Sequence, residues 1–111
     1  MMSNLSIFVN EELAYEYDRS TALDDNQAAF LDKMDGDMER GVKIHGETIS
    51  NPDARQKATF VAMNLLRALQ QDDQVRINVY CAYLNSRLPH LVEVHARDGD
   101  KRIDIELVEE H

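Results

Sequence analysis

The stretch that decides the fold is "DDQVRINVYCAYLNSRLPHLVEV", residues 72–94, because it fits two kinds of secondary structure. Apolar residues occupy alternate positions over residues 75–83, as in a half-buried strand. A strand over residues 75–84 would join the C-terminal strands in a three-stranded antiparallel sheet. The same stretch also has apolar residues at helical spacing, at Ile77, Cys81, Leu84 and Leu88.

We predict a helix over residues 74–88. It places Leu88 on the apolar stripe and ends before Pro89, where helices normally stop. Asp72 or Asp73 then caps its start. A second apolar stripe lies roughly opposite the first, at Val75, Val79 and Tyr83. A helix with two apolar stripes is expected to be buried on two sides.

Two further helices are predicted upstream. Residues 22–40 carry one helical stripe of apolar residues, and Thr21 followed by Asp24 resembles a capping box. Residues 52–71 carry a wide apolar face, and Asn51 before them is a good N-cap. The nine residues between these helices are expected to form a connector.

The C-terminal segment reads as an antiparallel β-hairpin over residues 91–97 and 102–108. Apolar residues alternate along both segments, and a type II′ turn at Gly99-Asp100 suits the short connection. This turn predicts pairs of Val94 with Ile105, His95 with Asp104, Arg97 with Arg102, and Glu93 with Glu106. Two of these pairs bring like charges together, which is mildly unfavourable.

The fold class expected from these elements is α+β, with three amphipathic helices followed by the hairpin. The chain is 43% hydrophobic and 30% charged, which is typical of a globular protein, so residues 1–111 are interpreted as a single small domain. Residues 1–19 fit both strand and helix patterns. We interpret them as an arm that docks on the body.

The charge of the chain argues against several classes of partner. Its net charge is −9, and Lys and Arg are not clustered, so we expect it to bind neither nucleic acid nor an anionic membrane surface directly. It lacks an apolar run of about 18 residues and a signal-like start. One cysteine fits a reducing compartment. We therefore expect a cytoplasmic protein.

The sequence contains no motif that carries a reaction. It lacks the glycine-rich phosphate loops, the HExxH zinc motif, the CxxC pair and the GxSxG nucleophile elbow. Cys81 lies within the apolar stripe of its element, where a cysteine is usually a small buried hydrophobic residue. These absences favour a protein that is not an enzyme, and we expect no cofactor.

The polar face of the hairpin offers the alternative site. Glu93 and His95 share one face of a strand, and Asp104 is expected across the ladder. A small enzyme or ligand-binding protein could use these three residues. Tight metal sites need three or four convergent ligands, so we expect no metal centre here.

The leading hypothesis is a non-catalytic interaction, adaptor or regulatory protein whose partner is another protein or a second copy of itself. Its candidate residues are Phe60, Met63 and Arg67. At about 100° per residue these lie away from the core stripe of the helix over 52–71. Either the arm of residues 1–19 covers Phe60 and Met63, or they anchor a contact surface with Arg67 at its rim.

Overall fold

A computed structural model describes residues 4–20, 23–100 and 102–110. In these ranges the chain is α+β, with three helices and six strands. The helices are α1 (Asp25–Glu39), α2 (Ala54–Gln70) and α3 (Gln74–Arg87). The strands are β1 (Leu5–Val9), β2 (Glu12–Tyr17), β3 (Val42–Ile44), β4 (Glu47–Ile49), β5 (Leu91–Asp98) and β6 (Ile103–Glu109).

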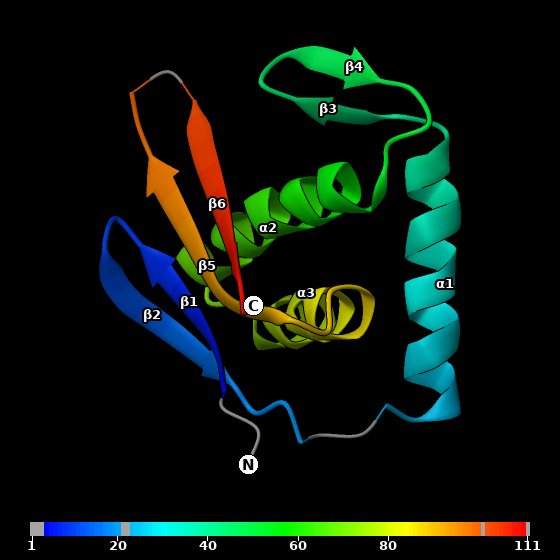
Figure 1. Ribbon diagram of the computed structural model, residues 1–111, viewed down its shortest axis with the longest axis horizontal. Helices are drawn as coiled ribbons and strands as arrows, with labels where there is room; N and C mark the ends of the chain where they lie inside the picture. Colours follow the sequence, from blue (N-terminus) through cyan, green and yellow to red (C-terminus); the bar gives the residue numbers. More distant parts are fainter. Residues whose placement is uncertain (1–3, 21–22, 101, 111) are drawn as a thin grey trace.

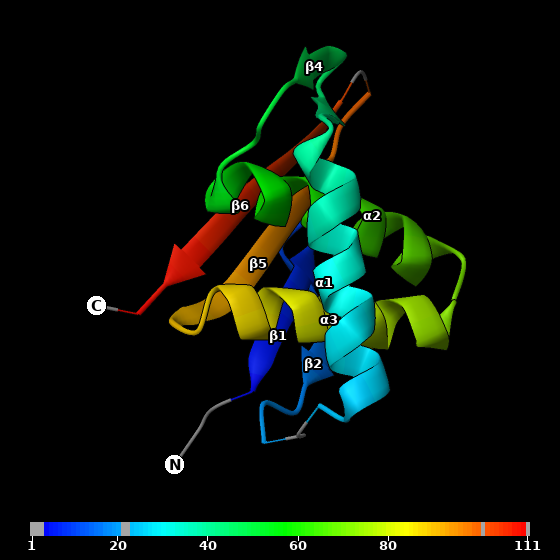
Figure 2. The same cartoon turned by 90° about the vertical axis from the view of Figure 1, so that its right-hand side faces the viewer.

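The elements form three layers (Figures 1 and 2). Strands β2-β1-β5-β6 make a four-stranded sheet in that order. Helices α2 and α3 cover one face of this sheet, and α1 crosses them on the side away from it. The predicted order, helices followed only by a C-terminal hairpin, is therefore wrong, because half of the sheet comes from the N-terminus.

Residues 5–17, part of the segment interpreted as a docking arm, form a β-hairpin within the main sheet. Strand β1 pairs antiparallel with β2 and parallel with β5. The β1–β2 connection is the two residues Asn10 and Glu11, with φ angles of 50° and 72°. Positive φ at both positions is the geometry of a type I′ turn, whose usual signal is Asn-Gly or Asp-Gly. Because Glu11 occupies the position where glycine is usual, the sequence lacks the usual signal for this turn.

The connector after α1 is also a hairpin. Strand β3 pairs with β4 through the turn residues His45 and Gly46, with φ angles of 52° and 80°. This small two-stranded unit lies beside α2, near the β5–β6 connection (Figure 1). It forms one wall of a cleft beside α2.

Strands β5 and β6 occur where they were predicted, but their register differs by two residues. Ala96 pairs with Ile105, so Arg97 faces Asp104 and His95 faces Glu106. This register replaces the expected Arg97–Arg102 and Glu93–Glu106 pairs with favourable or neutral ones. The connection is accordingly longer than a two-residue turn, and Gly99 does not adopt a positive φ.

Helix α3 confirms the helical interpretation of residues 74–88, and the strand over 75–84 is wrong. The Asp73 side chain caps it, and the Leu88 amide donates to the Leu84 carbonyl at its end. As expected, α3 is covered on two sides, with the sheet on one and α1 on the other, and α2 packs beside it in the same layer (Figure 1). Val75, at the start of the second stripe, stays exposed.

The other two helices begin slightly later than predicted. Asp24 caps α1 in a reciprocal pair with Gln27, and Asp53 caps α2 in the same way with Gln56. Asn51, the expected cap of α2, instead has a φ of 51° outside the helix. Asp24 and Asp53 are the N-caps because each is followed three residues later by a glutamine, which completes a capping box. Thr21 lies outside the described residues.

The core lies between the inner face of the sheet and helices α2 and α3. Its fully buried side chains include Leu5, Ile7, Val61, Leu65, Ile77, Cys81, Leu84, Leu91 and Val94. The sheet therefore contributes residues from both ends of the chain to one core. None of the helices in the described ranges is long and apolar enough to cross a membrane.

Candidate functional site

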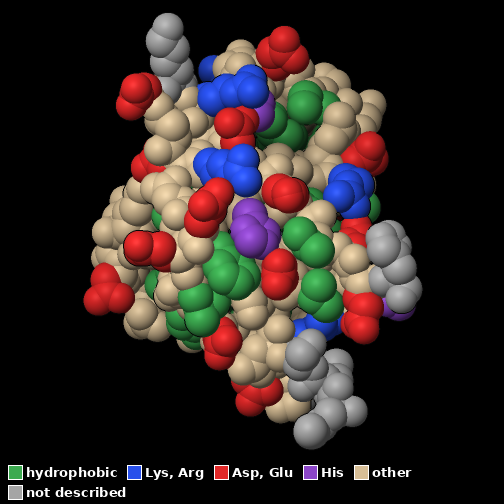
Figure 3. Space-filling view, turned by 60° about the vertical axis from the view of Figure 1, so that its left-hand side comes forward, with side chains coloured by type: hydrophobic (Ala, Val, Ile, Leu, Met, Phe, Trp, Pro, Cys, Tyr) green, Lys and Arg blue, Asp and Glu red, His purple; other side chains and the backbone are tan. Residues whose placement is uncertain are grey.

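One face of the four-stranded sheet is not covered by any described helix or strand (Figures 1 and 3). Ile7 and Val94 pair on neighbouring strands and are buried on the inner face. Their successors Phe8 and His95 also pair, so they point to the opposite, outer face. The outer face is the first candidate site.

A single row of side chains crosses all four strands on this outer face. Leu13 of β2 pairs with Phe8 of β1, which pairs with His95 of β5, which pairs with Glu106 of β6. We call these four residues the central row. The Phe8 and His95 rings are stacked, with centroids 4.6 Å apart and planes 5° apart. Leu13 is 52% exposed at the end of the row.

Acidic side chains lie in the central row and on both sides of it. The outer-facing acids, by the same alternation, are Glu16, Glu93, Asp104 and Glu106. Arg97 faces outward as well, but it lies opposite Asp104 and 3.9 Å from the Glu11 carboxylate. In Figure 3 a histidine lies between hydrophobic side chains on this side of the molecule, with acidic side chains around them. The face therefore combines apolar and aromatic surface with negative charge.

The structure brings together two of the three residues predicted at the hairpin's polar face. The His95 ring donates from Nε2 to Glu93 Oε1 over 2.9 Å. Asp104 faces Arg97 instead of His95, and its Oδ1 lies 3.0 Å from Arg102 Nε. The two-residue difference in register separates it from the pair. No group of three or more potential metal ligands occurs among the described residues.

The predicted group of Phe60, Met63 and Arg67 is also divided. Phe60 is half-buried and packs against the core, while α2 contacts β3, β5 and β6. Residues 5–17, which as an arm were one of the two predicted alternatives for covering it, form β1 and β2 instead, on the other side of β5 from β6. Met63 and Arg67 line a cleft.

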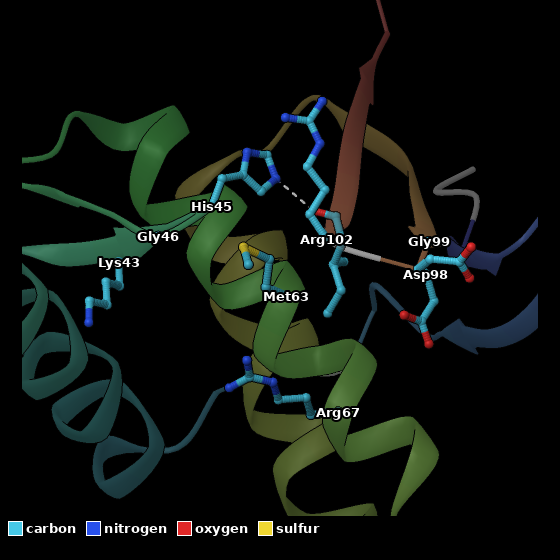
Figure 4. Close-up of a pocket in the computed structure, with 10 residues that line it drawn as sticks. Lys43, His45, Gly46, Met63, Arg67, Asp98, Gly99 and Arg102 are labelled. Carbon is cyan, nitrogen blue, oxygen red and sulfur yellow. Dashed lines mark hydrogen bonds between the residues drawn. The ribbon is translucent and has the colours of Figure 1, made fainter.

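This cleft, of about 670 Å³, lies between the β3–β4 hairpin, α2 and the β5–β6 connection (Figure 4). Its charged and sulfur-containing lining comes from Lys43, His45, Met63, Arg67, Asp98, Asp100 and Arg102. The sequence did not predict the cleft, because it depends on the β3–β4 hairpin. A His-Gly pair between two short extended segments is the signal that could have indicated that hairpin.

Hydrogen bonds fix the two ends of the cleft. His45 donates from Nε2 to the Ile103 carbonyl over 2.7 Å, which ties the β3–β4 turn to β6. Asp98 accepts a hydrogen bond of 2.9 Å from the Gln70 side-chain amide at the end of α2. Figure 4 places Asp98 across the cleft from Lys43, with Met63 and Arg67 on α2 between them.

A separate groove of about 310 Å³ lies between α1 and α3. Its apolar lining includes Phe30, which is 50% exposed, and Val75, which is 73% exposed. Phe30 belongs to the helical pattern of apolar residues predicted over 22–40, yet it is half exposed. Only Leu31 and Met38 of that helix are buried, because α1 touches the body along a narrow line.

Cys81 is fully buried in the core, as expected. Desolvation by burial raises the pKa of its thiol to about 12. The thiolate is the nucleophilic form of cysteine, so this residue is a poor candidate for covalent catalysis.

No family model, curated protein or solved structure matches this chain. What the chain can do is therefore inferred from its own surfaces.

Proposed function

We propose that this protein is a non-catalytic interaction domain that binds a basic partner protein through the outer face of its sheet. The observation that carries the proposal is the central row, in which exposed Leu13 and stacked Phe8 and His95 lie within a rim of carboxylates. Apolar and aromatic groups at the centre with charges at the rim are the usual anatomy of protein interfaces.

The charge of the rim selects the partner. Acidic residues outnumber basic ones on the outer face, and the whole chain carries −9. Complementary charge speeds association and disfavours wrong partners. Two copies meeting through this same face would set acid against acid, since a twofold interface places one patch on itself. A basic partner is therefore favoured over a second copy.

The proposal includes a cytoplasmic location, which the single cysteine supports. The alternative of a small enzyme around Glu93, His95 and Asp104 receives no comparable support, because Asp104 lies with Arg97 and Arg102. In the proposed function Glu93 and His95 belong to the contact face. His95 offers an aromatic surface there, and Glu93 fixes its ring.

Photo-crosslinking in the native cell tests this proposal. A benzophenone amino acid replaces Leu13 in one variant and Val75 in a matched control, since both side chains are exposed but lie on different faces. We expect one discrete adduct with a basic protein at position 13 only. That adduct is lost when Glu16→Lys and Glu106→Lys are added.

Three outcomes would overturn the proposal. The first is an absence of any adduct at position 13, and the second is the same adduct at both positions. The third is an adduct of the chain with a second copy of itself.

A further inference from the structure

The cleft beside α2 differs in charge from the rest of this acidic molecule. Lys43 comes from β3, Arg67 from α2 and Arg102 from the β5–β6 connection. These three basic side chains and the His45 ring lie around one cleft, although the chain as a whole carries a net charge of −9. Three segments that are far apart in the sequence thus place basic side chains around the same cleft.

Two of these cations lack a carboxylate partner. Within the described ranges, neither Lys43 nor Arg67 forms an ion pair, and Arg102 Nε lies 3.0 Å from Asp104 Oδ1. Most of the other described Lys and Arg residues do form ion pairs, namely Arg55, Lys57, Arg76, Arg87 and Arg97. The cleft therefore offers positive charge that the fold does not itself neutralise.

The helix dipole explains only part of this arrangement. Arg67 lies in the last turn of α2, where a cation is favourable. Lys43 gains nothing from that dipole, since it belongs to β3 and reaches the cleft from the opposite wall (Figure 4).

We infer that this cleft binds a small ligand with at least two negative charges, carried by phosphate or carboxylate groups. A cleft of about 670 Å³ is within the size range of small-molecule sites. The ligand's charged groups lie toward Lys43 and Arg67, and its less polar part contacts Met63. This site is separate from the outer face of the sheet and does not depend on the proposed function.

The two acids of the cleft set the ligand's orientation. Asp98 lies across the cleft from Lys43, and Asp100 belongs to the same connection as Arg102 (Figure 4). Both would repel an anion that approached their side. Removing the charge of Asp98 is therefore expected to strengthen binding, whereas a cation-binding site would be weakened by the same change.

Titration of the isotope-labelled protein by NMR tests the inference. The probes are inorganic pyrophosphate and citrate, in low salt, in two separate series that distinguish phosphate from carboxylate. We expect saturable shifts confined to the cleft, including Lys43, Gly46 and Met63, with at least one probe. Hydrogen bonds to charged groups contribute more than neutral ones, so K43Q/R67Q should weaken binding by about tenfold or more.

A matched control separates a built site from general attraction. Lys33 and Arg40 also make no ion pair within the described ranges, but Lys33 lies on α1, Arg40 is the C-cap residue of that helix, and both lie outside the cleft. K33Q/R40Q should bind the probe as the unmodified protein does, and Asp98→Asn should bind it more tightly. Equal losses in the two double variants, weaker binding by Asp98→Asn, or no saturable binding of either probe would overturn the inference.

Discussion

The buried phenol of Tyr83 on α3 donates a hydrogen bond of 2.5 Å to Asp35 Oδ1 on α1. Arg87, one turn further along α3, donates from Nε to the other oxygen of Asp35 over 2.8 Å, and it also reaches Asp32 over 2.9 Å. Helix α1 buries little apolar surface of its own. These polar contacts are therefore a large part of what holds α1 against α3.

Removing the phenol oxygen should weaken this attachment. Tyr83→Phe deletes the donor to Asp35 and is expected to lower the free energy of unfolding by about 1–2 kcal/mol. Asp35→Asn should also lower it, since Arg87 would lose its charged partner. Urea denaturation measures both changes. Asp37→Asn, on the exposed side of α1, is the control and should leave the stability unchanged, whereas equal effects at positions 35 and 37 would contradict the role of this contact.

The same contact predicts how stability depends on pH. Burial alone would raise the pKa of Asp35, but hydrogen bonds from Tyr83 and Arg87 and the charges of Arg87 and Lys57 outweigh it and lower this pKa. A carboxyl with a lowered pKa in the folded state stabilises the fold above its unfolded pKa, and that contribution is lost as the pH falls through the folded value.

We therefore expect the unmodified protein to lose stability relative to Asp35→Asn as the pH falls below about 4. Thermal denaturation of both proteins across this range measures the difference. A constant difference down to pH 2 would contradict the assignment.

The β1–β2 turn predicts a stabilising substitution. Glu11 has a φ of 72°, a left-handed conformation that costs a non-glycine residue roughly 1–2 kcal/mol. Glu11→Gly removes this cost but adds freedom to the unfolded chain, so we expect a net gain of about 0.5–1 kcal/mol. Glu12→Gly, in the adjoining strand, should instead destabilise the fold. Stability that falls equally in both variants would show that this turn does not have type I′ geometry.

Burial predicts that Cys81 is inert in the folded protein. The side chain is fully buried and its thiol pKa is raised to about 12, so few molecules carry an accessible thiolate at neutral pH. Reaction with a thiol reagent, followed by absorbance, should be far slower in native protein than in denaturant. Equal rates in the two conditions would return Cys81 to the candidates for catalysis.

The sequence could predict the helices because their signals are long and local. The stretch over 74–88 has a start, a periodic stripe and a stop at Pro89, and together these outweigh its strand-like composition. The β1–β2 and β3–β4 hairpins are short, and Glu11 and His45 occupy turn positions where Asn, Asp or Gly is usual. The parallel pairing of β1 with β5 joins residues almost ninety positions apart, so no local pattern indicates it.

The candidate sites depended on the same long-range contacts. Glu93 and His95 could be placed on one face because strand alternation is local, and they do form a hydrogen bond. Asp104 could not be placed, since a two-residue shift between strands conserves the buried face and changes every pair. Phe8 and Leu13, which complete the outer face, belong to the hairpin that the sequence hid.

Binding to the partner found by crosslinking tests the role of the sheet's outer face most directly. The measurement is calorimetric titration of that purified partner with unmodified protein, Leu13→Lys and the matched Val75→Lys. We expect Leu13→Lys to weaken binding by about tenfold or more, because it places a cation against a basic surface within the contact. Val75→Lys should bind as the unmodified protein does, and affinity should fall as salt is added. Unchanged binding by Leu13→Lys together with loss of binding by Val75→Lys would contradict this role. That result would identify the groove between α1 and α3 as the contact surface.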